Sequence, residues 1–158
     1  MKSLKGKNIW LTGASSGIGE AMAYLLNLEE ANLIISARRK EELERVQKNC
    51  HSPEKVKILT VDLADAFSLP QKAKEADRMW EGGIEVLINN GGISQRDKVI
   101  NTSLDVDRKL MEVNYFGTIA LSKALLPGMI ERKRGHHVVI TSAVGIISTP
   151  YRSAYSAA

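Results

Sequence analysis

Residues 12–19 read Thr-Gly-Ala-Ser-Ser-Gly-Ile-Gly, and this stretch decides the fold that the remaining chain is expected to adopt. An apolar run at residues 8–11 precedes it, and residues 20–26 continue with helical spacing. Glycines let the backbone turn sharply and approach a ligand, while the first turn of the new helix directs unpaired N–H groups at an anion. A dinucleotide pyrophosphate suits such a strand–turn–helix unit, and an ordinary glycine turn is the alternative. The predicted contacts are Gly13, Ser15, Ser16, Gly17, Ile18 and Gly19.

The bulk composition is that of one globular domain covering residues 1–158. The chain is 44% hydrophobic and 25% charged, with a net charge of +4. Lysines and arginines are scattered among acids, so we expect no nucleic-acid partner. Cys50 is the only cysteine, and the adjacent His136 and His137 point to opposite faces of a strand, so we expect neither an intrachain disulfide nor a metal site. No apolar run approaches membrane-spanning length, and we expect a cytoplasmic protein.

Strand-like and helix-like segments alternate along the chain. After the first strand and helix, short apolar runs predict strands at residues 31–37, 56–61, 84–88 and 136–141. Amphipathic segments predict helices at 41–48, 68–80 and 103–132. This order predicts an α/β fold, a doubly wound parallel sheet with helices on both faces, whose ligand crevice lies at the carboxyl ends of the strands.

The pair Arg38-Arg39 follows the second predicted strand, and it bears on the choice of cofactor. Arg38 comes 25 residues after Gly13 (38 minus 13). At an interval of roughly 20 residues, proteins that bind NAD place an acid on the ribose hydroxyls. Guanidinium groups here favour a 2′-phosphate and therefore NADP, although both arginines could instead begin a solvated helix.

Two further strand ends carry candidate contacts to the cofactor. Asp62 and Leu63 follow the third strand, where Asp62 could bond an adenine amino group, or equally form a turn or a helix N-cap. Asn89 to Gly91 follow the fourth strand, where amides and glycines let the chain pass close to a ligand, with a plain Asn-Gly turn as the alternative.

Three polar residues in the second half of the chain are candidates for catalysis. Asn114 lies inside the predicted helix 103–132, where asparagine is a poor helix former, and its amide could hold a water. The spacing of Thr102 and Asp105 predicts a capping box at the start of this helix. Ser142 ends the fifth strand, and Tyr155 follows 13 residues later (155 minus 142) on an expected helix.

These motifs, taken together and in this order, resemble the short-chain dehydrogenase/reductase family. They are Thr12-Gly13-x-x-x-Gly17-x-Gly19, Asn89-Asn90-x-Gly92, Asn114, Ser142 and Tyr155. The stretches 89–96, 102–115 and 130–133 are similar to the dehydrogenase/reductase member 7 subgroup, which acts on lipophilic carbonyls. The usual alanine of the second motif is Gly91 here, as in that subgroup, and Ser16 stands where some NADP-preferring members are basic.

The resemblance implies a Rossmann fold and hydride transfer between NADP(H) and a lipophilic carbonyl or secondary alcohol. The resemblance implies that Tyr155 is the general acid/base and that Ser142 hydrogen-bonds and orients the substrate oxygen. It also implies that Asn114 holds a water that relays protons. It also implies a homo-oligomer. The family's active-site lysine would occupy position 159, so a nucleotide-binding module without catalysis is the alternative. We expect residues 1–158 to be the N-terminal part of a longer single-domain enzyme, with strand 136–141 left as an exposed edge because the C-terminal strands are missing.

Overall fold

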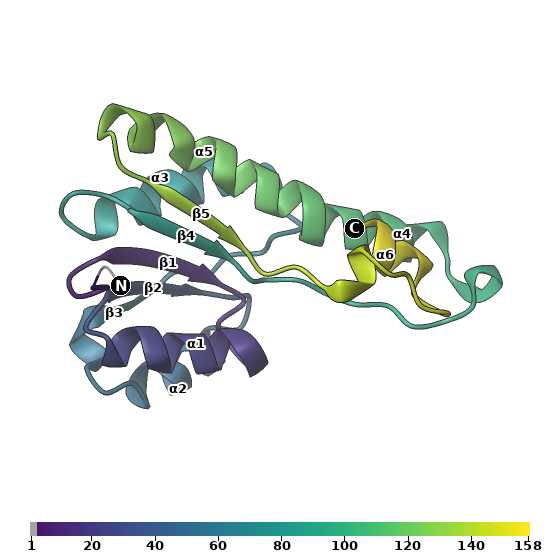
Figure 1. Cartoon of the computed structure of the whole chain (residues 1–158), viewed down its shortest axis with the longest axis horizontal. Helices are drawn as coiled ribbons and strands as arrows, with labels where there is room; N and C mark the ends of the chain where they lie inside the picture. The colour runs from purple at the N-terminus through teal and green to yellow at the C-terminus, as the bar shows by residue number, and fades with distance from the viewer. Residues whose placement is uncertain (1–2) are drawn as a thin grey trace.

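A computed structural model describes residues 3–158, in which five parallel strands form one sheet between two layers of helices (Figure 1). The order across the sheet is β3-β2-β1-β4-β5, and each neighbouring pair runs parallel. The predicted doubly wound α/β fold is confirmed, and the order reverses between β1 and β4, which is where ligands bind in such sheets. The strands are β1 (Asn8–Thr12), β2 (Asn32–Ser36), β3 (Val56–Ile58), β4 (Val86–Asn89) and β5 (His136–Val139).

Helices cover both faces of the sheet because side chains in each central strand alternate between two apolar clusters. Helices α1 (Gly17–Leu28) and α2 (Lys40–Lys48) lie on one face, while α3 (Leu69–Met79) and α5 (Gly117–Glu131) lie on the other (Figure 1). In β1, Ile9 and Leu11 join the first cluster and Trp10 joins the second. Burial on both faces explains why β1 reads as a continuous apolar run.

Strand β5 forms one edge of the described sheet. It pairs with β4, while Val139 and Ile140 remain exposed, as the sequence predicted for this edge. The strand ends two residues before the predicted boundary, although the amide of Ile140 still donates to the carbonyl of Asn89 at 2.9 Å. The third strand is also shorter than predicted, because only residues 56–58 keep strand geometry.

The helix predicted over residues 103–132 is present from residue 104 to residue 131, but a π-helical stretch in its middle was not predicted. The segment consists of α4 (Leu104–Leu110), a π-helical stretch (Met111–Phe116) and α5. Asn114 lies within the π-helical stretch, where its side-chain amide bonds to the backbone of Ile93 and its carbonyl accepts the hydroxyl of Thr118. These competing bonds accompany the wider turn, which apolar periodicity does not reveal.

The predicted capping box at the start of this helix was wrong. The N-cap residue is Ser103, and its side chain makes no capping bond. The hydroxyl of Thr102 instead donates to the carbonyl of Lys98 and accepts from the side chain of Gln95. Thr102 therefore stabilises the loop before α4.

The last helix, α6 (Ser153–Ala157), lies beside α4, and the chain reaches it through exposed loops (Figure 1). Among residues 3–158, no helix is both long and apolar enough to cross a membrane. Short 3₁₀ helices complete the secondary structure at Pro53–Lys55, Val99–Asn101 and Ala143–Gly145.

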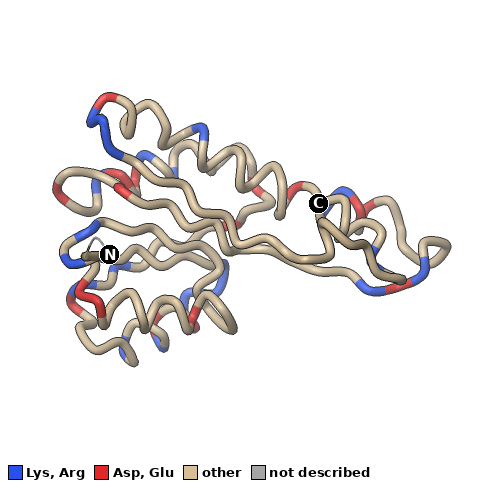
Figure 2. Tube along the Cα trace, in the orientation of Figure 1, with Lys and Arg blue, Asp and Glu red and all other residues tan. Residues whose placement is uncertain are grey.

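Acidic and basic residues are interspersed along the chain (Figure 2). The basic run at residues 132–134, which closes α5, has partners within the fold. Arg132 makes a bidentate pair with Asp77 of α3, with 2.9 and 2.8 Å between guanidinium nitrogens and carboxylate oxygens, and Arg134 donates to the carbonyl of Gly82. These contacts join the end of α5 to the α3–β4 connection.

Candidate active site

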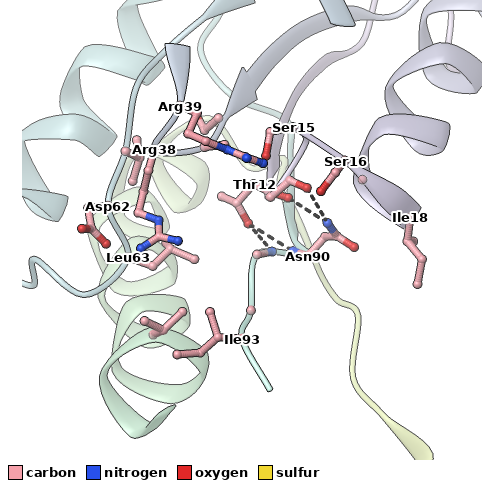
Figure 3. A pocket seen from close by; sticks show the side chains of 18 residues that line it. Thr12, Ser15, Ser16, Ile18, Arg38, Arg39, Asp62, Leu63, Asn90 and Ile93 are labelled. Carbon is pink, nitrogen blue, oxygen red and sulfur yellow. Dashed lines mark hydrogen bonds between the residues drawn. The ribbon is translucent and has the colours of Figure 1, made fainter. Parts of the chain in front are cut away.

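A cavity of about 390 Å³ opens at the carboxyl ends of β1, β2 and β4 and beside the loop after β3 (Figure 3). It collects most of the residues predicted to bind a cofactor, although they come from four separate segments. Gly17 is outside its lining but has a φ of +58°, which only glycine adopts readily. The predicted residues that line it are Gly13, Ser15, Ser16, Ile18, Gly19, Arg38, Arg39, Asp62, Leu63 and Gly91.

The glycine turn passes too close to its neighbours for side chains at two positions. A Cβ on Gly13 would lie 2.6 Å from the Cα of Gly91, and a Cβ on Gly19 would lie 2.2 Å from the carbonyl oxygen of Gly13. Ser16, the N-cap residue of α1, makes no side-chain capping bond. The turn therefore presents a narrow backbone cradle at a helix N-terminus, and this arrangement fits the pyrophosphate of a dinucleotide.

Thr12 and Asn90 hold this cradle to the loop that follows β4. The hydroxyl of Thr12 accepts from the amides of Asn90 and Gly91 at 3.1 and 3.0 Å. The side chain of Asn90 donates to the carbonyls of Thr12 and Gly13 at 3.1 and 3.2 Å (Figure 3). Both residues belong to the motifs quoted above, which were the available signal, but the specific contacts predicted in those motifs included Gly13, Asn89 and Gly91.

Asn89 does not lie in the cavity that the glycine turn lines. Its side chain is buried at the end of β4 and donates to the hydroxyl of Ser122 at 3.3 Å. Its amide oxygen has no partner among residues 3–158, and the residue lines a second cavity. Asn90 lines the first cavity instead, because successive side chains in an extended chain point in opposite directions. A cofactor contact at Asn89 stays a prediction, and it would have to be made from the second cavity.

Arg38 and Arg39 are exposed and extend over the first cavity (Figure 3). Within the described part of the chain, neither forms an ion pair with a carboxylate. Both guanidinium groups are therefore available to an anionic ligand.

Of the alternatives for Asp62, the turn is observed, because its carboxylate accepts from the amide of Ala64 at 3.0 Å.

Arg45 of α2 supports the glycine turn from outside the cavity. It donates to both carboxylate oxygens of Glu20 at 2.7 and 2.9 Å and to the carbonyl of Ser15 at 3.3 Å. Hydrogen bonds from Arg45, and to a lesser extent from Tyr24, lower the pKa of Glu20 to about 2. This role of Arg45 could not be predicted from the sequence, because the residue lies in an ordinary charged helix with no local signal.

The second cavity, of about 480 Å³, adjoins the first. Both are lined by Ile18 and by the loop from Asn90 to Ile93. The three residues predicted to be catalytic, Asn114, Ser142 and Tyr155, all line the second cavity. The fold therefore brings the predicted cofactor-binding residues and the predicted catalytic residues to adjacent cavities at the carboxyl ends of the strands.

Asn114 anchors the loop that the two cavities share. Its amide oxygen accepts from the amide of Ile93, and its amide nitrogen donates to the carbonyl of Ile93, both at 2.9 Å. The side chain that we expected to hold a water is thus already paired with backbone groups. The backbone carbonyl of Asn114 accepts from Thr118 at 2.9 Å and retains a second lone pair.

Ser142 and Tyr155 reach the second cavity from loops after β5 and from α6. The Ser142 oxygen accepts from the amide of Val144 at 3.2 Å and caps a 3₁₀ turn. Tyr155 is half-buried, and the guanidinium carbon of Arg152 lies 5.6 Å from its ring centre. Arg152 also bonds to the hydroxyl of Ser94, which ties α6 to the loop after β4.

Comparison with known proteins supports a family assignment. The short chain dehydrogenase family model matches residues 7–158. Dehydrogenase/reductase SDR family member 7 of Homo sapiens is 48% identical over 154 residues, which covers 94% of this chain and 45% of that protein. A dehydrogenase/reductase SDR family protein 7-like from Anopheles gambiae is 45% identical, covering 99% of this chain and 51% of its own length. The chain spans about half the length of the curated relatives it matches.

Solved structures show the same arrangement of elements. A short chain dehydrogenase/reductase family protein has a TM-score of 0.89 at 28% identity, over 98% of this chain and 63% of that one. A short-chain dehydrogenase from Streptomyces avermitilis has a TM-score of 0.89 at 34% identity, over 97% and 55% of the two chains. The similarity thus covers nearly all of the chain described above.

Proposed function

The chain belongs to the short-chain dehydrogenase family, and we propose that it carries the cofactor site and the catalytic tyrosine of an NADP-dependent oxidoreductase. In this proposal, residues 1–158 act as a single dinucleotide-binding domain. The observation that carries the proposal is the junction of the two cavities along the loop from Asn90 to Ile93. One cavity has the features of a dinucleotide site, and the other has two hydroxyl side chains suited to a carbonyl oxygen.

The first cavity suits NADP along its whole length. The backbone of the Gly13–Gly19 turn would hold the pyrophosphate, since side chains are excluded there. Arg38 and Arg39 would hold the 2′-phosphate by charge-assisted hydrogen bonds. Asp62 and Leu63 would bound the adenine, with Leu63 as the apolar contact. This orientation directs the other end of the cofactor toward Tyr155.

With NADPH held by these residues, a hydride would be available for the carbonyl carbon of the substrate. In the reductive direction, Tyr155 donates its phenolic proton to the carbonyl oxygen, so that the product is an alcohol. Ser142 orients that oxygen by hydrogen bonding. Asn114 fixes the loop at Ile93 and offers its backbone carbonyl to a water that returns a proton to Tyr155. In the oxidative direction, the same residues act in reverse order.

The proposed substrate is a lipophilic carbonyl compound or secondary alcohol. Val139 and Ile140 line the second cavity, and both are exposed to a ligand. Ile146 and Ile147 are exposed in the adjacent loop. Apolar side chains around a few polar groups are typical of sites for small lipophilic molecules.

A turnover assay tests this proposal on the intact natural protein that contains this sequence. The protein is incubated with NADPH and a panel of lipophilic ketones and aldehydes, and Tyr155→Phe is the matched variant. We expect Tyr155→Phe to lower kcat by about 10²- to 10⁴-fold and to leave NADPH affinity unchanged. Equal activity in both proteins would exclude the role of Tyr155. NADPH binding without turnover of any substrate would favour the nucleotide-binding module without catalysis.

A second assay tests the choice of cofactor. Arg38→Asp removes a cation and adds an anion where the 2′-phosphate would lie, so we expect NADPH affinity to fall about tenfold or more. NADH lacks that phosphate, and its affinity should change much less. Lys40→Asp is the control, because Lys40 pairs with Glu44 on the surface of α2. Equal effects of Arg38→Asp on both dinucleotides would remove Arg38 from the 2′-phosphate site.

We also propose that the intact protein is a homo-oligomer that associates through the segment from α4 to α5. Several apolar side chains are exposed there, and a second copy could cover them. They include Tyr115, Phe116, Leu126 and Ile130. Light scattering of the intact protein tests this, and a monomeric mass at micromolar concentration would contradict it.

A further inference from the structure

Leu63 lies in a slot that exists because Gly91 has no side chain. A Cβ built on Gly91 would lie 2.6 Å from the Cδ1 atom of Leu63, well inside van der Waals contact. The same Cβ would lie 3.3 Å from the amide nitrogen of Gly13 and from the hydroxyl oxygen of Thr12. Those two atoms belong to the hydrogen-bonded glycine turn, so Leu63 is the neighbour that would have to move.

A second glycine restricts Leu63 from the side of the helix. A Cβ on Gly117, at the start of α5, would lie 2.7 Å from the carbonyl oxygen of Leu63 and 2.9 Å from its Cβ. The backbone of Leu63 is therefore held against α5 while its side chain reaches Gly91. Leu63 packs with the apolar cluster that contains Trp10 and also lines the first cavity.

We propose that Gly91 is a positioning residue for the adenine half of the ligand, because it sets how far Leu63 extends along the wall of the dinucleotide cavity. This inference deepens the proposed function and rests on it. Since α5 blocks a backbone retreat of Leu63, a methyl group at position 91 turns its side chain out of the slot and into the space beside Asp62 and Arg38. That space lies away from Tyr155, at the adenine end of the proposed cofactor.

The consequence concerns the adenine half of the ligand. Close-packed sites tolerate an added methyl group poorly, because a displaced side chain takes volume from the ligand. Gly91 and Leu63 act as a pair in this chain, and neither residue determines the shape of the adenine site by itself.

A double-mutant cycle on the intact natural protein tests this pairing. Affinity is measured by calorimetry for NADPH and for adenosine 2′,5′-bisphosphate, which lacks the nicotinamide half. We expect Gly91→Ala to weaken binding of both ligands on the order of tenfold. In the Leu63→Ala background, the same substitution should change both affinities by less than about twofold, because the colliding atoms are gone. Gly145→Ala is the control for an added methyl group, since its Cβ would meet no atom within 4 Å.

Thermal unfolding of the four ligand-free proteins separates the possible failures. If the wild type binds neither ligand, the proposed function fails, and the unfolding cycle still measures the pairing of Gly91 with Leu63. If Gly91→Ala does not fold but the double variant folds and binds as Leu63→Ala does, the inference stands. Equal effects of Gly91→Ala in both backgrounds, or misfolding of the double variant as well, would overturn it.

Discussion

The two adjoining cavities differ in how well the strands beside them are paired and buried. The walls of the first come from the ends of β1, β2 and β4, whose strands have neighbours on both sides and whose side chains are buried on both faces. The second depends on β5, which pairs with β4 alone within residues 3–158 and leaves Val139 and Ile140 exposed. The first cavity thus lies at strands that are paired on both sides, whereas the second lies beside a strand that has one unpaired edge among residues 3–158.

Hydrogen bonding shows the same difference. Around the glycine turn, the hydroxyl of Thr12 bonds to three backbone groups, and the side-chain amide of Asn90 bonds to two. At the second cavity, the amide oxygen of Asn89 is buried without a partner among the described residues. A buried polar atom without a partner costs free energy, so Asn89 does not stabilise the second cavity as Thr12 and Asn90 stabilise the first.

Among the variants that test this comparison, Gly19→Ala is expected to have the largest effect, because it disrupts the well-packed first cavity. The new Cβ would lie 2.2 Å from the carbonyl oxygen of Gly13. This oxygen cannot move away easily, because it is a backbone atom in a turn that Asn90 holds by hydrogen bonds. We expect NADPH affinity to fall at least about 100-fold and the unfolding free energy to fall by ~2–4 kcal/mol. Calorimetry and urea unfolding measure both. Unchanged NADPH affinity would show that the turn is less constrained than its contacts indicate.

Thr12→Val tests how far hydrogen bonding alone holds the first cavity. Valine keeps the shape of threonine but leaves the amides of Asn90 and Gly91 without their acceptor. We expect a loss of about 1–3 kcal/mol in unfolding free energy and a several-fold weaker affinity for NADPH. Thr12→Ser retains the hydroxyl and is the control. If the valine and serine variants behave alike, the hydroxyl does not stabilise the cradle.

Asn114→Leu tests the link between the two cavities. Leucine removes both bonds to Ile93 while keeping similar volume, so the shared loop loses its anchor on the substrate side. We expect kcat to fall on the order of tenfold to 100-fold, with less than about a threefold change in NADPH affinity. Asn101→Leu, at an exposed position before α4, is the control. A larger loss of cofactor affinity than of kcat would contradict the division between the two sides.

The smallest expected effect is a pH dependence that arises from β5. His137 lies opposite Leu87 in the sheet, and burial, followed by repulsion from His136, lowers the pKa of its imidazole below the ordinary value. As pH falls below about 6.5, the unfolded chain binds a proton that the folded chain resists, so stability decreases toward acid. The slope from this group is at most about 1.4 kcal/mol per pH unit.

His137→Phe should reduce this slope between pH 7 and pH 5, as measured by urea unfolding at each pH. His51→Gln changes an exposed histidine outside the sheet and serves as the control. An unchanged slope in His137→Phe would show that the edge strand does not limit stability in acid.

Much of the fold could be predicted because its signals are local. The glycine turn, the alternation of apolar runs and helices, and the basic pair at Arg38 each depend on neighbouring residues. The sequence could not show that Asn90 lies at the glycine turn while Asn89 faces Ser122, since a shift of one residue reverses a side chain in extended structure. Arg45 was missed because its contact to Ser15 spans residues that are distant in sequence.

The sequence by itself determined the order of the strands and helices, the family, and the types of side chain at each strand end. Only the tertiary structure decided which of those side chains share a cavity. It also introduced a π-helical stretch around Asn114 within the long helix and placed Leu63 between Gly91 and Gly117. The physical reason is that periodicity and propensity act over one or two helical turns, whereas close contacts depend on how separate segments pack.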